Sequence, residues 1–341
     1  MAFFINFGPM KETVVSGIRP TGKLHLGNYF GAVTNFVKMQ HDYNCYFFIA
    51  DLHSLTTHPT PGDLHGYVKH VLVEYLACGI NPEESTIYIQ SDVPEVAELY
   101  LYLNMNAYLG ELERSTSFKD KVRSQPDNVN AGLLTYPTLM AADILIHKAT
   151  KVPVGKDQEQ HLEMTRTFGN RFNRLYNAET FPEAFAFSYS ENLVKVPGLD
   201  GKGKMGKSEG DANCIYLSDS PEVIRKKVSK AVTDGGPTEE NQQKPEAIEN
   251  LFNLMKIVSP ADTVNYFDEQ YNKCAIRYGD FKKQLAEDMI IFNTPIREKI
   301  EDIAKDTSYL RQVARHGALK ARESAQKTLK EVRSLIGFKP F

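Results

Sequence analysis

The sequence predicts an α/β fold in which a parallel-sheet domain is followed by a C-terminal helical domain. Two observations support this. Apolar runs typical of buried strands alternate with helical stretches in the amino-terminal part, and long amphipathic patterns dominate from Glu246 onward. The 341 residues leave room for two or three domains. We expect an extension at 1–10, a sheet domain at 11–215 and a helical domain at 216–341, whose end can pack back on the sheet domain.

The first strand is expected at Thr13–Val15, and an amphipathic helix at Tyr29–Met39. The loop between them contains Gly17, Gly22 and Gly27, which let a backbone approach a ligand closely. A helix beginning near Gly27 would present unpaired N–H groups to an anion. A nucleotide phosphate is therefore the expected ligand, and an ordinary strand-to-helix turn is the simpler alternative.

Three polar side chains in this loop, those of Thr21, His25 and Asn28, are not required to make a turn. His25 and Asn28 are three residues apart at the expected helix start, so both side chains lie on one face. This face would open toward the end of the preceding strand. The polar set therefore favours a binding site over a plain turn.

The run Asn44–Ala50 is continuously apolar, as in a strand buried on both faces. His53 follows its carboxyl end, where open α/β sheets bind ligands, although a packed or capping histidine is an equal alternative. A helix over Pro61–Ala77 and a strand over Ser85–Gln90 complete a β-α-β-α-β pattern. This pattern predicts a Rossmann-like nucleotide-binding half.

The stretch from Ala131 to His161 holds a second set of candidates. Tyr136, Met140 and Asp143 share one face of a helix that we expect Pro137 to start. The residues around Asp143 are apolar, so its carboxylate needs a hydrogen-bond donor. The donor can come from the protein or from a bound ligand.

Two later segments carry further polar groups. A short strand at 151–154 precedes the helix opening at 155–161, where Asp157 can serve as an N-cap. His161 and Glu163 do not have a zinc-ligand spacing, and no structural metal is expected. The loop at 202–208 is rich in glycine and lysine, and is either a surface loop or a clamp for a polyphosphate.

These motifs together resemble the class I aminoacyl-tRNA synthetases. His25-Leu26-Gly27-Asn28 resembles the HIGH element, and Lys204-Met205-Gly206-Lys207-Ser208 resembles the KMSKS element with glycine where serine is usual. The segments Gly17–Tyr29 and Leu133–Leu145 are similar to the tryptophanyl branch of the family. Gly155-Lys156-Asp157-Gln158 resembles the GxDQ element of the family. Four motifs in this order along the chain are more specific than any one of them.

The resemblance implies that the protein activates L-tryptophan with ATP and Mg²⁺ and transfers it to the 3′-terminal adenosine of tRNA(Trp), using positioning and charge stabilisation without a general base. It implies catalytic roles for Thr21, His25, Asn28, Lys121, Lys204 and Lys207. It implies ATP binding by Arg19, Pro20, Thr21, Gly27, Asn28, Gly155, Lys156, Asp157, Val196, Lys204, Met205, Gly206, Lys207 and Ser208. It implies tryptophan binding by Val15, His53, Tyr136, Met140, Asp143, Val152, Val154 and Gln158, with Asp143 accepting the indole N–H.

The resemblance also implies a homodimer and an anticodon-binding role for the helical domain. The formal net charge of −3 gives no global basic field, but residues 296–341 hold 11 Lys/Arg against 6 Asp/Glu, an excess that suits phosphate contacts. No apolar run approaches the roughly 20 residues of a membrane span, and we expect a cytoplasmic protein. Cys45, Cys78, Cys214 and Cys274 are scattered, so we expect free buried thiols and no iron–sulfur cluster.

Three alternatives stay open. A tyrosyl-tRNA synthetase would share the fold and both elements, and an amino-acid panel in pyrophosphate exchange would distinguish it. A nucleotidyltransferase of the coenzyme-biosynthesis type would use a similar first loop, but its smaller chain would leave the carboxyl-terminal region without a role. A non-catalytic RNA-binding protein that kept the fold would be favoured by Gly206 and by the absence of exchange activity.

Overall fold

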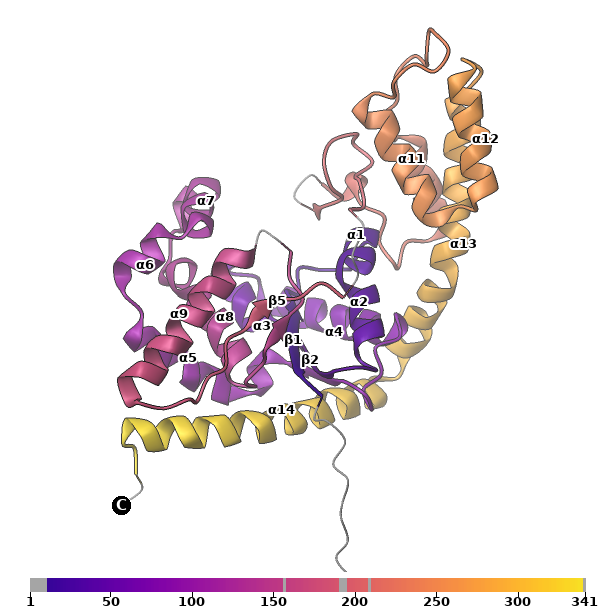
Figure 1. Cartoon of the computed structure of the whole chain (residues 1–341). Helices are drawn as coiled ribbons and strands as arrows, with labels where there is room; N and C mark the ends of the chain where they lie inside the picture. The colour runs from indigo at the N-terminus through magenta and orange to yellow at the C-terminus, as the bar shows by residue number, and fades with distance from the viewer. Residues whose placement is uncertain (1–10, 156–157, 190–194, 208–209, 340–341) are drawn as a thin grey trace, which may run out of the picture.

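The computed structural model describes residues 11–155, 158–189, 195–207 and 210–339. At its centre is a parallel five-stranded sheet of order β3-β2-β1-β4-β5 (Figure 1). The strands are β1 Thr13–Ile18, β2 Asn44–Ile49, β3 Thr86–Ile89, β4 Lys151–Val152 and β5 Phe185–Ala186. The predicted parallel sheet followed by helices is confirmed. The strand β5 was not predicted, because it has only two residues, both of them exposed.

Helices surround the sheet and fill the carboxyl-terminal region. Those before β4 are α1 Leu26–Asn28, α2 Thr34–Met39, α3 Asp51–Ser54, α4 Pro61–Ala77, α5 Pro94–Asn106, α6 Leu109–Arg114, α7 Thr116–Ser124 and α8 Ala131–Leu145. Those after β4 are α9 Glu159–Tyr176, α10 Pro221–Ser229, α11 Glu246–Val258, α12 Ala261–Asn272, α13 Tyr278–Lys305 and α14 Thr307–Ile336. A π-helical turn at Tyr29–Val33 joins α1 to α2.

The start of α8 differs from the prediction. The helix begins at Ala131, where the side chain of Asn130 accepts the N–H of Leu133 as an N-cap, and Pro137 lies in the helix interior. A proline is compatible with the first turn of a helix, which is why Pro137 suggested a start, but its ring offers no N–H to the preceding turn. The helix therefore lacks one main-chain hydrogen bond near its middle.

Two apolar cores lie on opposite faces of the sheet. Val14 and Phe47 point into the core shared with α2, α4 and the helices α10 to α13. Their neighbours Val15 and Phe48 point into the core shared with α5, α8 and α9. Successive side chains of a strand alternate between the faces, and covering helices bury both sets.

The long helix α14 belongs to both cores. Leu310 and Val313 lie in the first core, whereas Ala321 and Ala325 lie in the second. Between them Gly317 crosses the edge strand β3 so closely that a Cβ atom would stand 1.6 Å from the carbonyl oxygen of Ile87. Figure 1 shows α14 running beneath the sheet, while α13 rises away from it to α11 and α12. The helix thereby covers a sheet edge that would otherwise be exposed.

The cysteines match the prediction only in part. All four are free, and Cys45 and Cys214 are buried, but Cys78 is only half-buried and Cys274 is exposed. Cys274 lies in the turn after α12, where its backbone has a positive φ of 55°. Among the helices of the described residues, none has the length and apolar character needed to cross a membrane.

Candidate active site

Two neighbouring cavities lie at the carboxyl ends of the central strands. The first, of about 390 Å³, is bounded by β1, β2 and β4 and by α7, α8 and α9. Its lining includes every residue predicted to bind the amino acid, namely Val15, His53, Tyr136, Met140, Asp143, Val152, Val154 and Gln158. Phe48, Ala50 and Ile144, which were not predicted, add apolar wall. The predicted common face of α8 does meet a cavity.

Asp143 is the buried acceptor of this first cavity. Its side chain is 1% exposed, its Oδ1 accepts from Gln90 Nε2 at 2.7 Å, and its Oδ2 lies 2.9 Å from His53 Nε2. Burial raises the pKa of Asp143, while the contacts with His53 and Gln90 act in the opposite direction. The protein donor that the sequence analysis allowed for is therefore confirmed, and a donor from a bound ligand stays a prediction. Protein donors meet the carboxylate, and the same residue still faces the cavity, where each oxygen has a further lone pair.

A second polar group closes the other end of the first cavity. The Nε2 atom of His161 lies 2.7 Å from both Tyr136 Oη and Ser117 Oγ, and its Nδ1 lies 2.8 Å from Gln158 Oε1. These contacts join α7, α8 and the start of α9. The sequence analysis tested His161 only as a metal ligand. Its spacing of three from Gln158 at a helix start was the signal that could have placed it in the site.

Two cations also line the first cavity. Lys121 Nζ lies 3.6 Å from the centroid of the Tyr136 ring, and burial, together with the charge of Arg19, lowers the pKa of Lys121 to about 8. Arg19 is itself half-buried, and its Nε is buried without a hydrogen-bond partner among the described residues. Both cations line the first cavity, whereas the resemblance implied ATP binding for Arg19 and a catalytic role for Lys121. Those roles stay predictions.

The second cavity, of about 670 Å³, adjoins the first at Val154, which lines both. Five of the predicted ATP-binding residues line it, namely Gly27, Gly155, Val196, Lys204 and Met205. The carbonyl oxygen of Val196 accepts the N–H of Met205 at 2.8 Å, which holds the segment before the lysine loop against the loop itself. Phe36, Phe187 and Tyr189 add aromatic wall that the sequence analysis did not predict.

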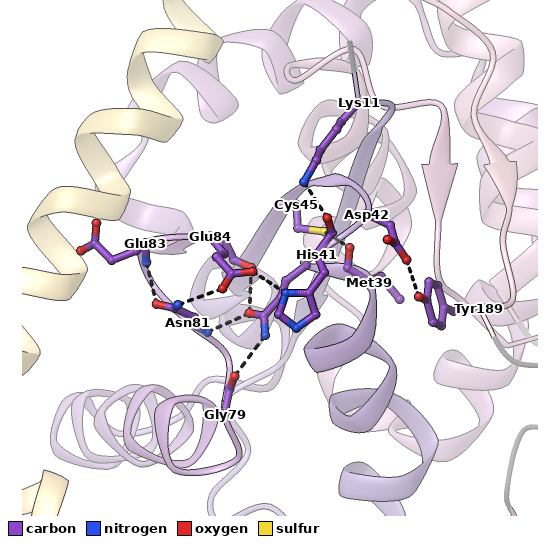
Figure 2. Close-up of polar contacts among 12 residues, drawn as sticks. Lys11, Met39, His41, Asp42, Cys45, Gly79, Asn81, Glu83, Glu84 and Tyr189 are labelled. Carbon is purple, nitrogen blue, oxygen red and sulfur yellow. Dashed lines mark hydrogen bonds and ion pairs between the residues drawn. The ribbon is translucent and has the colours of Figure 1, made fainter. Parts of the chain in front are cut away.

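The aromatic wall of the second cavity, formed by Phe187 and Tyr189 after β5, is held by residues of the turn between α2 and β2. Figure 2 shows Tyr189 reaching Asp42, whose carboxylate accepts its hydroxyl. Phe187 and Tyr189 also pack edge-on against Tyr43. In the same view His41 contacts Glu84, so the turn between α2 and β2 is tied to the loop before β3 as well. One side of the second cavity thus rests on the body of the sheet domain.

The first loop is organised by His25, which is the N-cap of α1. Its Nδ1 accepts the N–H of Asn28, while Asn28 Oδ1 accepts the N–H of His25. Burial, with a contribution from the Lys207 charge, lowers the pKa of His25 to about 4. The imidazole is therefore neutral near pH 7. Because Nδ1 is an acceptor, the ring proton is on Nε2, which leaves one N–H to donate.

The first loop and the lysine loop come together in space. Lys207 Nζ lies 3.3 Å from Thr21 Oγ1, and the N–H of Leu26 donates to the carbonyl of Ile215 at 2.9 Å. Burial lowers the pKa of Lys207, and Glu74 acts against this shift. Pro20, Thr21, Asn28, Gly206 and Lys207 are not in the lining of either cavity described above. Lys156, Asp157 and Ser208, also predicted for ATP, lie outside the described residues.

Comparison with known proteins shows the family of the chain. The family of tRNA synthetases class I (W and Y) matches residues 10–293 of the chain. A Tryptophan–tRNA ligase of Porphyromonas gingivalis is 65% identical over 328 residues, covering 96% of this chain and 100% of that protein. A Tryptophan–tRNA ligase of Clostridium perfringens is 41% identical, covering 97% of this chain and 98% of that protein.

Among solved structures, the tryptophanyl-tRNA synthetase of Campylobacter jejuni in complex with ADP and tryptophan superimposes with a TM-score of 0.86. It is 35% identical, and the match covers 96% of this chain and 100% of that one. Sequence and fold thus agree over nearly the whole length. The chain belongs to the class I tRNA synthetases of the tryptophan and tyrosine group.

Proposed function

We propose that the protein is a ligase that joins L-tryptophan to tRNA(Trp), with tryptophanyl-adenylate as the intermediate. The observation that carries the proposal is the pair of adjoining cavities. The first contains a buried carboxylate among apolar walls, and the second lies beside the first loop and the lysine loop. The relatives that bear the name of this activity, and the family to which the chain belongs, support it.

Asp143 would select the amino acid. An indole N–H would donate to a free lone pair of its carboxylate. A phenyl ring would displace water from the carboxylate and offer no donor in its place. A site built around a buried acceptor rejects an analogue that lacks the donor by about 10⁴-fold or more. Gln158 and Tyr136, held by His161, would then face the amino group of the substrate at the opposite end of the cavity.

The activation step needs positioning more than acid–base chemistry. The carboxylate oxygen of tryptophan attacks the α-phosphorus of ATP in line and forms a new P–O bond. The bond from the α-phosphorus to the bridging oxygen breaks, and pyrophosphate leaves with that electron pair. Lys204 and Lys207 would stabilise the charge that grows on the leaving pyrophosphate, and the neutral His25 would donate from Nε2. ATP brings Mg²⁺ with it. A hydroxyl of the 3′-terminal adenosine of tRNA(Trp) then attacks the tryptophanyl carbonyl carbon, an ester bond forms, and AMP leaves as the acyl–phosphate bond breaks.

A homodimer in the cytoplasm is the proposed working form. Five large apolar side chains are at least 47% exposed on α5, on α9 and around the start of α6, namely those of Leu101, Met105, Tyr108, Leu109 and Leu175. Arg171 of α9 lies over the Tyr108 ring at 4.2 Å, which ties these elements together. An exposed apolar surface of this kind suits contact with a second copy of the chain.

ATP–pyrophosphate exchange with a panel of amino acids tests the proposal. Tryptophan should stimulate exchange strongly, and phenylalanine and tyrosine should give rates near the background. Stronger stimulation by tyrosine would contradict the proposed specificity. The absence of exchange with every amino acid, while ATP still binds, would contradict the proposed activity.

A further inference from the structure

The turn that ends α8 contains a buried histidine outside both cavities. His147 is 4% exposed and its ring stacks on Tyr46, with ring centroids 4.1 Å apart. Its Nε2 lies 3.0 Å from Tyr88 Oη, and its Nδ1 lies 3.1 Å from Ser324 Oγ of α14. Burial lowers the pKa of His147 to about 3, so the ring stays neutral. A neutral imidazole has one donor and one acceptor nitrogen, and here each has a partner.

The carboxyl-terminal part of α8 makes a second contact near the end of β3, through Asp143 of the first cavity. Gln90 follows β3 and donates to Asp143, while Tyr88, two residues earlier, meets His147, four residues after Asp143. Side chains two apart on a strand lie on one face, and residues four apart in a helical segment lie one turn apart. The carboxyl end of α8 is thus held against β3 by two side-chain contacts, one of which continues to α14.

Because of the proline inside α8, the position of Asp143 depends more strongly on these two side-chain contacts. Pro137 removes one main-chain hydrogen bond upstream of Asp143, so the part of α8 that carries the carboxylate is less restrained by the helix itself. The position of Asp143 in the cavity then depends on the anchors at its own end of the helix. Ser324 is the member of this set that comes from the far end of the chain.

We propose that Ser324, acting through His147 and Tyr88, is a positioning residue for Asp143, so that the C-terminal helix takes part in selecting the amino acid. This inference rests on the proposed function. The Ser324 hydroxyl holds the His147 imidazole in one tautomer and orientation. The imidazole, through Tyr88, fixes the position of the end of α8 along β3. The Asp143 carboxylate thereby keeps its distance to the bound indole.

Two variants of nearly equal shape isolate the hydroxyl. Ser324→Thr keeps it, and Ser324→Val replaces it with a methyl group. A matched control is Glu331→Ala, which removes the exposed contact between the same two segments, where Lys148 Nζ lies 2.7 Å from Glu331 Oε2. The chain contains no tryptophan, so the emission anisotropy of added L-tryptophan reports its binding without background from protein indoles. The KM for ATP in pyrophosphate exchange is measured in parallel.

We expect Ser324→Val to weaken tryptophan binding about fivefold to tenfold, because a buried imidazole nitrogen loses its hydrogen-bond partner. Ser324→Thr should stay within about twofold of the wild type in this measurement, as should Glu331→Ala, since exposed ion pairs contribute little. The KM for ATP should change by less than about twofold in all of them, because the second cavity is untouched.

Equal tryptophan affinity for the Thr and Val variants would overturn the inference, as would an equal loss of ATP and tryptophan affinity. A lower melting temperature of the Val variant with unchanged tryptophan affinity would also overturn it, since the hydroxyl would then act on stability alone. Failure of the proposed function looks different, because the wild type itself would then show no tryptophan-dependent exchange.

Discussion

The two cavities are built from different material. The first is bounded mainly by strands and helices, and its polar groups are held by neighbouring side chains, as Asp143 is by Gln90 and His53. The second is bounded largely by connecting segments, including those around Gly155 and Val196. A fixed acceptor suits discrimination between similar side chains, whereas loops suit a group whose charge changes during the reaction. The predictions below test this division of roles.

The largest expected effect is on the fixed acceptor. Asp143→Ala should raise the KM for tryptophan about 10³-fold, because the indole N–H loses its acceptor and the donors of Gln90 and His53 are left unpaired. The KM for ATP should change little. Pyrophosphate exchange at varied tryptophan and varied ATP measures both. An equal loss of the two affinities would mean that Asp143 is a structural residue of the whole site.

A smaller effect is expected in the lysine loop, with the opposite signature. Lys207→Ala should lower the rate of adenylate formation about 10²-fold and weaken ATP binding much less, because the ammonium group acts mainly on charge that develops as pyrophosphate departs. Single-turnover kinetics separate the two quantities. If ATP affinity alone falls, the lysine loop binds ATP in the ground state. The proposed role of this loop in stabilising charge that develops during the reaction would then be wrong.

A third prediction concerns the support of the first loop. Glu74 of α4 is 2% exposed, it accepts the N–H of Leu24 at 2.8 Å, and burial raises its pKa to about 8. A carboxyl group with a raised pKa in the folded protein holds a proton that the unfolded chain has lost. Its contribution to stability is therefore complete below its ordinary pKa of 4.5 and declines as the pH rises toward about 8.

Glu74→Gln keeps an acceptor for Leu24 but cannot ionise. In the wild type the melting temperature should fall as the pH rises from 4.5 to about 8, which corresponds to a loss on the order of a few kcal/mol in unfolding free energy. The variant should not show this fall. Thermal unfolding from pH 4.5 to 8.5 measures it, with the wild type as reference. Parallel pH profiles for the two proteins would show that Glu74 is ionised in the folded state.

The smallest effect is expected at the anchored wall of the second cavity. Tyr189→Phe removes the hydroxyl that Asp42 accepts and keeps the packing on Tyr43. Because this contact is solvent-accessible, the KM for ATP should rise less than about threefold, and the KM for tryptophan should not change. A change in the tryptophan KM of comparable size would show that the two cavities are not independent.

Part of the first cavity could be predicted from the chain alone, since His53 follows a strand end and the Asp143 face repeats along one helix. The rest of the predicted lining was implied by the family resemblance. The partners of Asp143 were beyond prediction. Gln90 and His53 meet it only because β2 and β3 lie side by side and α8 packs across their ends, and pair distances of this kind are a tertiary property. The start of α8 was placed wrongly because Pro137 gave a stronger local signal than the Asn130 cap.

The wrong prediction that Cys274 is buried has a similar explanation. A lone cysteine in an amphipathic region is usually buried, and nothing nearby in the chain marks its turn as exposed. By contrast, the end of the chain was expected to be able to pack back on the sheet domain, and α14 does pack there. Its exact path around β3 depended on one glycine, Gly317, whose contact lies 230 residues away in the sequence, at Ile87.

The cover of β3 by α14 also has a consequence during synthesis. A ribosome makes β3 long before α14, so the backbone groups along the outer side of Ile87 stay open to other chains until residues 307–336 have left the exit tunnel. A product truncated before Gly317 would keep that strand unprotected permanently. Such a fragment should depend on chaperones and aggregate on release, even though every residue lining the two cavities is already present.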